Sequence, residues 1–156
     1  MASNRHLGRI VALQTLYELD FRVEVEEKNL DRDAILQRNI DRYSEVVDDK
    51  EFISSLVHGV SEKQDELDNI IQPVAPDWPL AQIARIDRNI LRMGVYELYF
   101  SKSVPEKVVI NEAVELAKSF GADNSSKFIN GVLGTVLKNL EAEMPKKKPT
   151  TKKVLK

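Results

Sequence analysis

Residues 103–140 read SVPEKVVINEAVELAKSFGADNSSKFINGVLGTVLKNL, and their apolar side chains recur every three or four positions, as on one face of an α-helix. Ser103 and Glu106 stand three residues apart with a proline between them, which predicts a capping box. Gly121 predicts the end of this helix as a left-handed C-cap. Residues 123–126 supply N-caps for a second helix. We therefore expect two consecutive helices here.

The same periodicity extends over most of the remaining chain and predicts helices at residues 4–21, 31–44, 50–71 and 80–101. Residues 72–79 contain three prolines and must break the helix, so Asp77 is the expected N-cap of the next helix, with Pro79 in its first turn. No stretch alternates with period two. The sequence predicts one all-α domain of about six or seven helices over residues 1–144, followed by a basic, disordered tail over residues 145–156.

Two glycines interrupt the last predicted helix. Gly131 and Gly134 each cost about 1 kcal/mol relative to alanine in a helix interior. Close approach of a neighbouring helix is the expected reason, and close approach of a ligand or partner backbone is the alternative.

The composition excludes several classes of protein. The chain has 156 residues, of which 42% are hydrophobic, so one core is expected. It has no cysteine, which excludes disulfides, cysteine-ligated zinc and a thiol nucleophile. No apolar run reaches the roughly 18–20 residues of a membrane span, and the N-terminus lacks a signal-peptide pattern. We expect a cytoplasmic protein without a membrane partner.

Charge is segregated along the chain, although the formal net charge is only −2. Residues 1–17 contain two arginines and no acid, and residues 18–51 contain twelve acids and six bases. Residues 142–156 contain six lysines and one glutamate. A basic N-terminal segment and a basic tail therefore flank an acidic body.

Binding residues are easier to find than catalytic ones. The sequence has no phosphate-binding glycine loop, nucleophile elbow or zinc-binding histidine pair, and no two carboxylates form an obvious acid–base pair. Arg5 and Arg9 stand one helical turn apart beside His6, where they would track phosphates on a shared face. The polar start of the last helix is a second phosphate site, to which Lys127 adds charge. Phe128 either enters the core or stacks on a base.

Four stretches carry a resemblance to a known family. They read ALQTLY (12–17), ILRMGVYEL (90–98), VPEKVVINEAVELAKSFG (104–121) and SKFINGVL (126–133). Their order and spacing resemble the NusB family of bacterial transcription antitermination factors, over residues 3–140. The resemblance implies a helical fold of two three-helix layers and no catalytic residues, metal or cofactor. It also implies binding to boxA RNA with the ribosomal protein NusE, in the RNA polymerase antitermination complex.

The resemblance assigns roles to individual residues. The RNA contacts of the family correspond here to Arg5, His6 and Arg9 and to the segment Asn124, Ser125, Ser126, Lys127 and Phe128. The surface for NusE corresponds to Tyr17, Phe21, Asp87 and Arg88. The chain departs from the family in a thinner arginine cluster at its start, and in Asn124, where an acid is common. A neutral side chain at that position repels phosphate less.

Other readings of the sequence remain open. One is a helical protein-interaction module, monomeric or homodimeric, that does not touch RNA. Another is the accessory domain of an RNA methyltransferase system, although 156 residues leave no room for its catalytic domain. A third is a hydrolase with scattered carboxylates, which requires an acid pair converging in a cleft.

Overall fold

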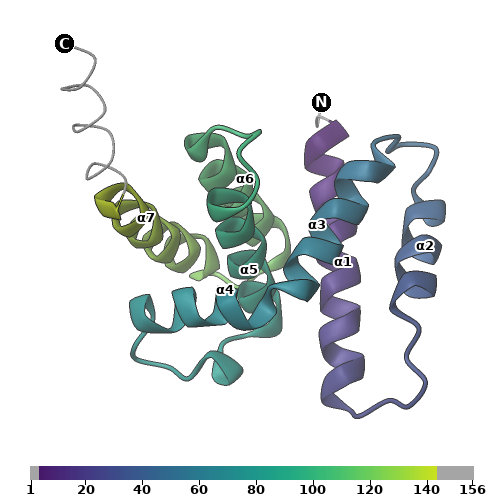
Figure 1. Cartoon of the computed structure of the whole chain (residues 1–156), viewed down its shortest axis with the longest axis horizontal. Coiled ribbons are helices and arrows are strands. Elements are labelled where there is room, and N and C mark those ends of the chain that lie inside the picture. Colours follow the sequence, from purple (N-terminus) through teal and green to yellow (C-terminus); the bar gives the residue numbers. More distant parts are fainter. Residues whose placement is uncertain (1–3, 144–156) are drawn as a thin grey trace.

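Seven α-helices and two short 3₁₀ helices make up residues 4–143, the part of the chain described by the computed structural model (Figure 1). The helices are α1 (Asn4–Glu24), α2 (Arg32–Arg42), α3 (Lys50–Glu62), α4 (Gln64–Ile71), α5 (Arg85–Tyr99), α6 (Glu106–Phe120) and α7 (Ser125–Glu143), and the 3₁₀ helices are η1 (Gln72–Val74) and η2 (Leu80–Gln82). No strand occurs within residues 4–143. The predicted all-α class is confirmed. The predicted tail lies outside the described residues.

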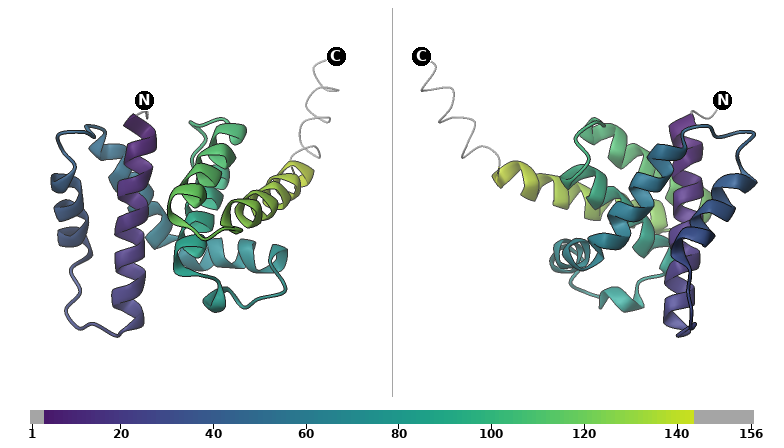
Figure 2. Two further views of the ribbon diagram at one scale, coloured as in Figure 1. Left: turned by 180° about the vertical axis from the view of Figure 1, so that it is seen from behind. Right: turned by 45° about the vertical axis from the view of Figure 1, so that its right-hand side comes forward.

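The helices form two groups with α5 between them. Helices α1, α2 and α3 pack together on one side, and α4, α6 and α7 cover α5 on the other (Figures 1 and 2). Helix α5 also packs against α1 and α3, so it contacts both groups. Ile90, Leu91 and Val95 of α5 are fully buried. Helix α5 is therefore the central helix of the fold, with neighbours on several sides.

The predicted helix over residues 50–71 is in fact two helices, because the chain turns at Lys63. The backbone of Lys63 leaves helical geometry at φ −106° and ψ 16°, and α4 departs from α3 in a new direction (Figure 1). Gly59 lies in the last turns of α3, where a Cβ would meet the Tyr96 ring at 2.2 Å. This glycine therefore allows α3 to approach α5 closely.

Three predicted helix caps are wrong. Helix α5 begins at Arg85 rather than after Asp77, because the chain first forms η2 and an extended residue, Ile83. The N-cap of α6 is Pro105, and no side chain caps it. Gly121 has φ −91°, so it is not a left-handed cap. It is glycine because a Cβ would meet the Ser125 side chain at 2.5 Å and a carbonyl at 2.8 Å.

The close-packing explanation for Gly131 and Gly134 is also wrong. A Cβ built on either residue meets nothing within 4 Å. The glycines that permit close helix contacts are instead Gly59 and Gly94. At Gly94 a Cβ would meet Leu133 at 2.8 Å.

None of the helices within residues 4–143 is long and apolar enough to cross a membrane.

Candidate nucleic-acid interface

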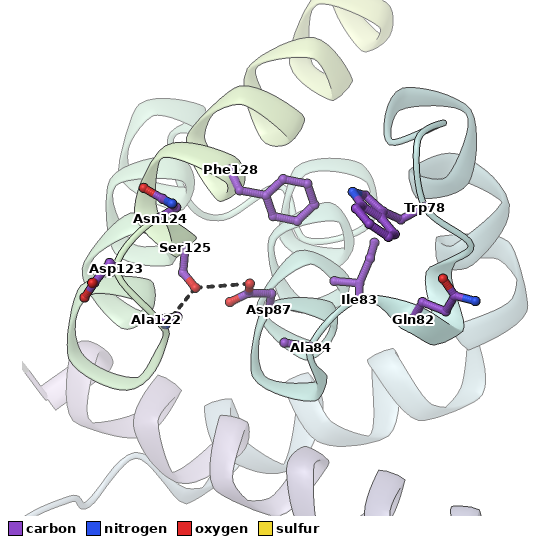
Figure 3. A pocket seen from close by; sticks show the side chains of 10 residues that line it. All are labelled: Trp78, Gln82, Ile83, Ala84, Asp87, Ala122, Asp123, Asn124, Ser125 and Phe128. Atoms are coloured by element: carbon purple, nitrogen blue, oxygen red, sulfur yellow. Dashed lines mark hydrogen bonds between the residues drawn. The ribbon is translucent and has the colours of Figure 1, made fainter.

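A pocket of about 600 Å³ opens where the start of α7 faces the start of α5 (Figure 3). We call it the α5–α7 pocket. It is lined by Trp78, Gln82, Ile83, Ala84, Asp87, Ala122, Asp123, Asn124, Ser125 and Phe128. Two segments that are far apart in sequence therefore meet here: the loop before α5 with the first turn of α5, and the α6–α7 turn with the first turn of α7.

Ser125 fixes the α6–α7 turn to α5. Its hydroxyl accepts a hydrogen bond from the backbone N–H of Ala122 at 2.9 Å and donates one to Oδ2 of Asp87 at 3.1 Å. Ser125 is only 4% exposed. The prediction that its side chain contacts RNA is therefore corrected: the hydroxyl is already used inside the protein, where it positions the turn.

Asp87 lines the same pocket from α5. While Oδ2 accepts the Ser125 hydroxyl, Oδ1 is buried and has no hydrogen-bond partner. A carboxylate oxygen in this state lacks compensation for its lost hydration. Asp87 is therefore the one polar side chain of the pocket with an unmet need for a donor.

Two aromatic side chains flank the pocket from different elements. Phe128 comes from the first turn of α7 and is half-buried, and Trp78 comes from the loop before α5 and is 59% exposed. Figure 3 shows the two rings on neighbouring walls, with Ile83 beneath Trp78. The Phe128 ring packs against the core, as one of the two alternatives predicts, and it also lines an open pocket, so stacking on a base stays a prediction.

The side chain of Gln72 fixes the loop that carries Trp78 through hydrogen bonds to its backbone. Its amide Nε2 donates to the carbonyls of Trp78 at 2.8 Å and Ala75 at 3.2 Å, and its Oε1 accepts from the N–H of Leu80 at 2.7 Å. The loop is therefore held in one conformation although it contains three prolines and only short 3₁₀ turns.

The remaining residues of the predicted RNA segment lie around the mouth of the pocket. Asn124 and Lys127 are exposed and Ser126 is partly exposed. The N–H groups in the first turn of a helix lack intrahelical acceptors and attract anions. This turn therefore offers phosphate-binding groups next to an aromatic ring.

The other predicted RNA segment is divided by the structure. Arg5 is exposed, with its guanidinium 4.3 Å from the Phe52 ring centroid and bonded to Asp49 at 3.1 Å. His6 is partly buried, and its Nδ1 lies 3.2 Å from Oε1 of Glu112. Of these residues, Arg5 offers the most accessible charge.

Arg9 does not share the exposed face of Arg5. It is 3% exposed, and its guanidinium donates to both carboxylate oxygens of Glu97, at 2.9 and 2.8 Å, and to Glu112 at 3.1 Å. Burial opposes the charge, but the hydrogen bonds and charges of both glutamates outweigh it and raise the pKa of Arg9. Arg9 therefore joins α1 to α5 and α6, and the predicted phosphate contact is corrected.

The predicted partner surface is likewise divided. Tyr17 and Phe21 are 38% and 47% exposed on one face of α1, and the guanidinium of Arg85 lies 5.5 and 5.3 Å from their ring centroids. Asp87 lies in the α5–α7 pocket instead. Sequence reasoning missed Arg85, because nothing local indicates which residue of α5 faces α1.

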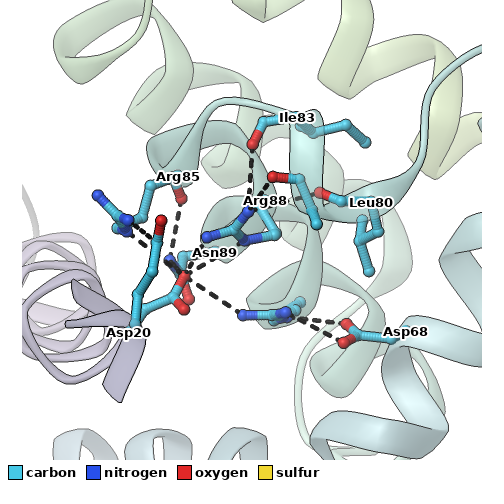
Figure 4. Close-up of polar contacts among 10 residues, drawn as sticks. Asp20, Asp68, Leu80, Ile83, Arg85, Arg88 and Asn89 are labelled. Atoms are coloured by element: carbon cyan, nitrogen blue, oxygen red, sulfur yellow. Dashed lines mark hydrogen bonds and ion pairs between the residues drawn. The ribbon is translucent and has the colours of Figure 1, made fainter. Parts of the chain in front are cut away.

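Arg88 is buried rather than available to a partner. It is 7% exposed, donates to Oδ2 of Asp20 at 2.8 Å, and donates to the carbonyl of Ala81 at 3.1 Å (Figure 4). Asn89 also donates to Asp20, at 3.0 Å. Burial would raise the pKa of Asp20, but hydrogen bonds from Arg88 and Asn89 and the charges of nearby arginines lower it. This network fixes α5 against α1.

No cluster of three or more potential metal ligands occurs within residues 4–143. Two carboxylates, of Asp87 and Asp123, line the α5–α7 pocket, and no histidine of the described residues does. Asp87 is hydrogen-bonded to the Ser125 hydroxyl and has one buried oxygen without a partner. The aromatic rings of Trp78 and Phe128 can stack on a flat ligand, and the polar groups of the lining can form hydrogen bonds to it.

Comparison with known proteins shows which family the chain resembles. The family model described as the NusB family matches residues 6–138. The chain is 44% identical to the transcription antitermination protein NusB of Chloroflexus aggregans, over 92% of this chain and 93% of that protein. It is 42% identical to the NusB of Roseiflexus castenholzii, over 88% and 94%.

Solved structures of NusB proteins match the fold of this chain. The structure of NusB from T. maritima superposes with a TM-score of 0.77 at 34% identity, covering 88% of this chain and 93% of that one. A structure of the antitermination factors NusB and NusE in complex with double-stranded RNA matches with a TM-score of 0.75 at 26% identity, covering 89% of this chain and 99% of the matched chain.

Proposed function

The chain belongs to the NusB family, and on that premise we propose that it is a noncatalytic antitermination factor that binds boxA RNA jointly with the ribosomal protein NusE. The observation that carries the proposal is the match, over nearly the whole length of both chains, to a NusB bound to NusE and RNA. We further propose that it acts in the cytoplasm within the RNA polymerase antitermination complex. Whether it does so as a monomer or a homodimer stays a prediction.

We assign the RNA to two separate groups of residues. The first is the mouth of the α5–α7 pocket, with Asn124, Ser126, Lys127 and Phe128, and the second is the start of α1, with Arg5 and His6. His6 contacts Glu112 on α6, and Gly121, where the α6–α7 turn begins, follows nine residues later. At 1.5 Å per residue, about 13.5 Å of helix therefore separates the two groups. An extended RNA strand rather than one phosphate group is the ligand that reaches both.

We assign NusE to the aromatic surface formed by Tyr17 and Phe21 with Arg85. Exposed aromatic side chains beside an arginine are the composition of interface hot spots. The guanidinium of Arg85 is also paired with Glu24, so the rings are held in place before a partner arrives.

Binding of a boxA RNA and of a scrambled RNA, with and without NusE and at two salt concentrations, tests the proposal. We expect preference for boxA and a stronger complex with NusE. The variant Lys127→Ala should weaken RNA binding and reduce the dependence of log K on log salt by about one unit. Lys28→Ala makes the same charge change on the exposed loop after α1 and should have little effect.

Equal binding of boxA and scrambled RNA, with no response to Lys127→Ala, would leave a protein-interaction module as the function. A tight complex with NusE that leaves RNA affinity unchanged would contradict joint binding.

A further inference from the structure

We propose that the α5–α7 pocket holds one unstacked nucleobase between Trp78 and Phe128, and that Asp87 selects guanine at this position. The inference rests on the proposed RNA binding and gives it a residue that reads the base. Three observations carry it: the two aromatic walls, the pinned but exposed Trp78, and the carboxylate oxygen without a partner.

The aromatic walls fit a flat ring. The pocket of about 600 Å³ lies in the range of small-ligand sites, and its lining is dominated by apolar atoms of Trp78, Ile83 and Phe128 (Figure 3). Every base has a π-face that stacks on such side chains, and single-stranded RNA is recognised in this way. A base in this pocket would contact Phe128 from α7 and Trp78 from the loop before α5.

Trp78 is prepared for such a contact. Its side chain is 59% exposed, and no ring contact or cation–π contact joins it to another side chain among residues 4–143. Gln72 nevertheless binds the backbone on both sides of it, through the Ala75 carbonyl before it and the Leu80 N–H after it. An exposed indole on a fixed loop loses little conformational entropy when a base stacks on it.

Asp87 supplies the hydrogen-bonding preference. A carboxylate only accepts hydrogen bonds, so the edge that it pairs with must donate. Guanine presents two adjacent donors on its Watson–Crick edge, the ring N1–H and the amino group at N2, and these match the two oxygens of one carboxylate. On the corresponding edges of adenine, cytosine and uracil every donor is flanked by an acceptor, so a carboxylate that pairs with both positions meets a lone pair that repels it.

Pairing requires the Asp87 carboxylate to turn toward the base, because Oδ1 is buried and Oδ2 already accepts the Ser125 hydroxyl. Oδ1 has no hydrogen-bond partner and Oδ2 uses one lone pair for the Ser125 hydroxyl. Rotation about the Cβ–Cγ bond exchanges the two oxygens at low cost, because this torsion is broad. The Ser125 hydroxyl also keeps the carboxylate within the pocket. The nearby phosphate groups would meet Lys127 and the first turn of α7 rather than the carboxylate.

The chain has a single tryptophan, so its fluorescence reports on this pocket alone. The test titrates the full chain with fluorescently labelled dodecamers of uridine that carry one central guanine, adenine or cytosine, and with the all-uridine dodecamer. Anisotropy of the label measures binding, and quenching of Trp78 measures stacking. We expect quenching by all four RNAs and about ten-fold tighter binding of the guanine RNA, within the range of one bidentate base contact.

Three variants separate the parts of the proposal. Asp87→Asn places a donor beside the base edge and should bring the affinity for the guanine RNA close to that for the adenine RNA. Asp65→Asn, which makes the same change on an exposed turn of α4, should keep the preference. Trp78→Ala should weaken binding of all four RNAs about five-fold or more, and its thermal unfolding measured by circular dichroism shows whether the fold is intact.

The outcomes distinguish this inference from the proposed function. RNA binding seen by anisotropy without quenching of Trp78 would overturn the base site and leave the antitermination role standing. Equal affinity for all four RNAs, or a guanine preference that survives Asp87→Asn, would overturn the role of Asp87. No binding of these RNAs or of boxA RNA would overturn both.

Discussion

Replacing Arg9 with methionine should destabilise the fold strongly. The guanidinium of Arg9 makes two hydrogen bonds to Glu97 and one to Glu112, and Glu97 is itself 3% exposed. Arg9→Met leaves the Glu97 carboxylate buried and unpaired, which costs about 3–5 kcal/mol. A domain of this size typically has about 5–15 kcal/mol of stability in total. We therefore expect the melting temperature to fall by about 6–20 °C.

Urea unfolding followed by circular dichroism measures the change, with Arg5→Met as the control. The variant Arg5→Met loses the same charge, but the Arg5 side chain is 47% exposed. We therefore expect its free energy of unfolding to fall by less than about 1 kcal/mol. The double variant Arg9→Met, Glu97→Met replaces the buried pair by apolar side chains of similar length. It should recover much of the loss, because the unpaired carboxylate is gone.

The reasoning fails if Arg9→Met changes the free energy of unfolding no more than Arg5→Met does. It also fails if the double variant is less stable than Arg9→Met alone. A loss of RNA affinity in a fully stable Arg9→Met variant would return Arg9 to the RNA surface that the sequence predicted.

Three further predictions concern other parts of the chain. Gly131→Ala should raise the free energy of unfolding by about 0.5–1 kcal/mol, because a Cβ there meets nothing within 4 Å, whereas Gly59→Ala should lower it, both measured in urea. Because the pKa of Asp20 is lowered in the folded protein, its carboxylate stabilises the fold above pH about 4, and this contribution is lost as the pH falls through the lowered value. The variant Asp20→Asn should therefore be less stable at pH 7. Its free energy of unfolding, measured from pH 7 to 2, should also fall less steeply with acid than that of the unchanged protein. Phe21→Ala should weaken NusE binding about ten-fold or more in calorimetry, and the equally exposed Val25→Ala should not.

Helix existence was predictable from the sequence because it depends on local periodicity. The boundaries that failed depend on longer-range contacts. Ser103 and Glu106 have the spacing of a capping box, yet Pro105 is the N-cap of α6 without any side-chain hydrogen bond. Asp77 is not the N-cap that the sequence predicts, because Gln72 accepts a hydrogen bond from the N–H of Leu80 and fixes the loop after Asp77 in a non-helical conformation. No local pattern reveals that bond.

The candidate site was predictable as segments but not as side-chain roles. Lys127 and Phe128 lie where the resemblance expects them, at the start of α7. Arg5 and Arg9 share a face by spacing, but one is exposed and the other buried, because the glutamates that receive Arg9 stand on α5 and α6. The sequence does not indicate a binding role for Trp78, since a single tryptophan in a proline-rich loop is just as often packed against the core.

The first turns of α5 explain how one small domain keeps two binding surfaces apart. Arg85 and Asp87 are two residues apart, which turns their side chains about 200° from one another on an α-helix. Arg85 accordingly lies over the rings of Tyr17 and Phe21, and Asp87 enters the α5–α7 pocket. Directly after Asp87, Arg88 pairs with Asp20 and holds this helix end against α1.

Loosening that anchor should therefore disturb both surfaces together, whereas replacing either outward side chain should disturb only one. A variant such as Asp20→Asn, assayed for both NusE and RNA at a temperature where it remains folded, distinguishes a shared anchor from two unrelated sites. Loss of one affinity with the other unchanged would show that the start of α5 does not position both surfaces.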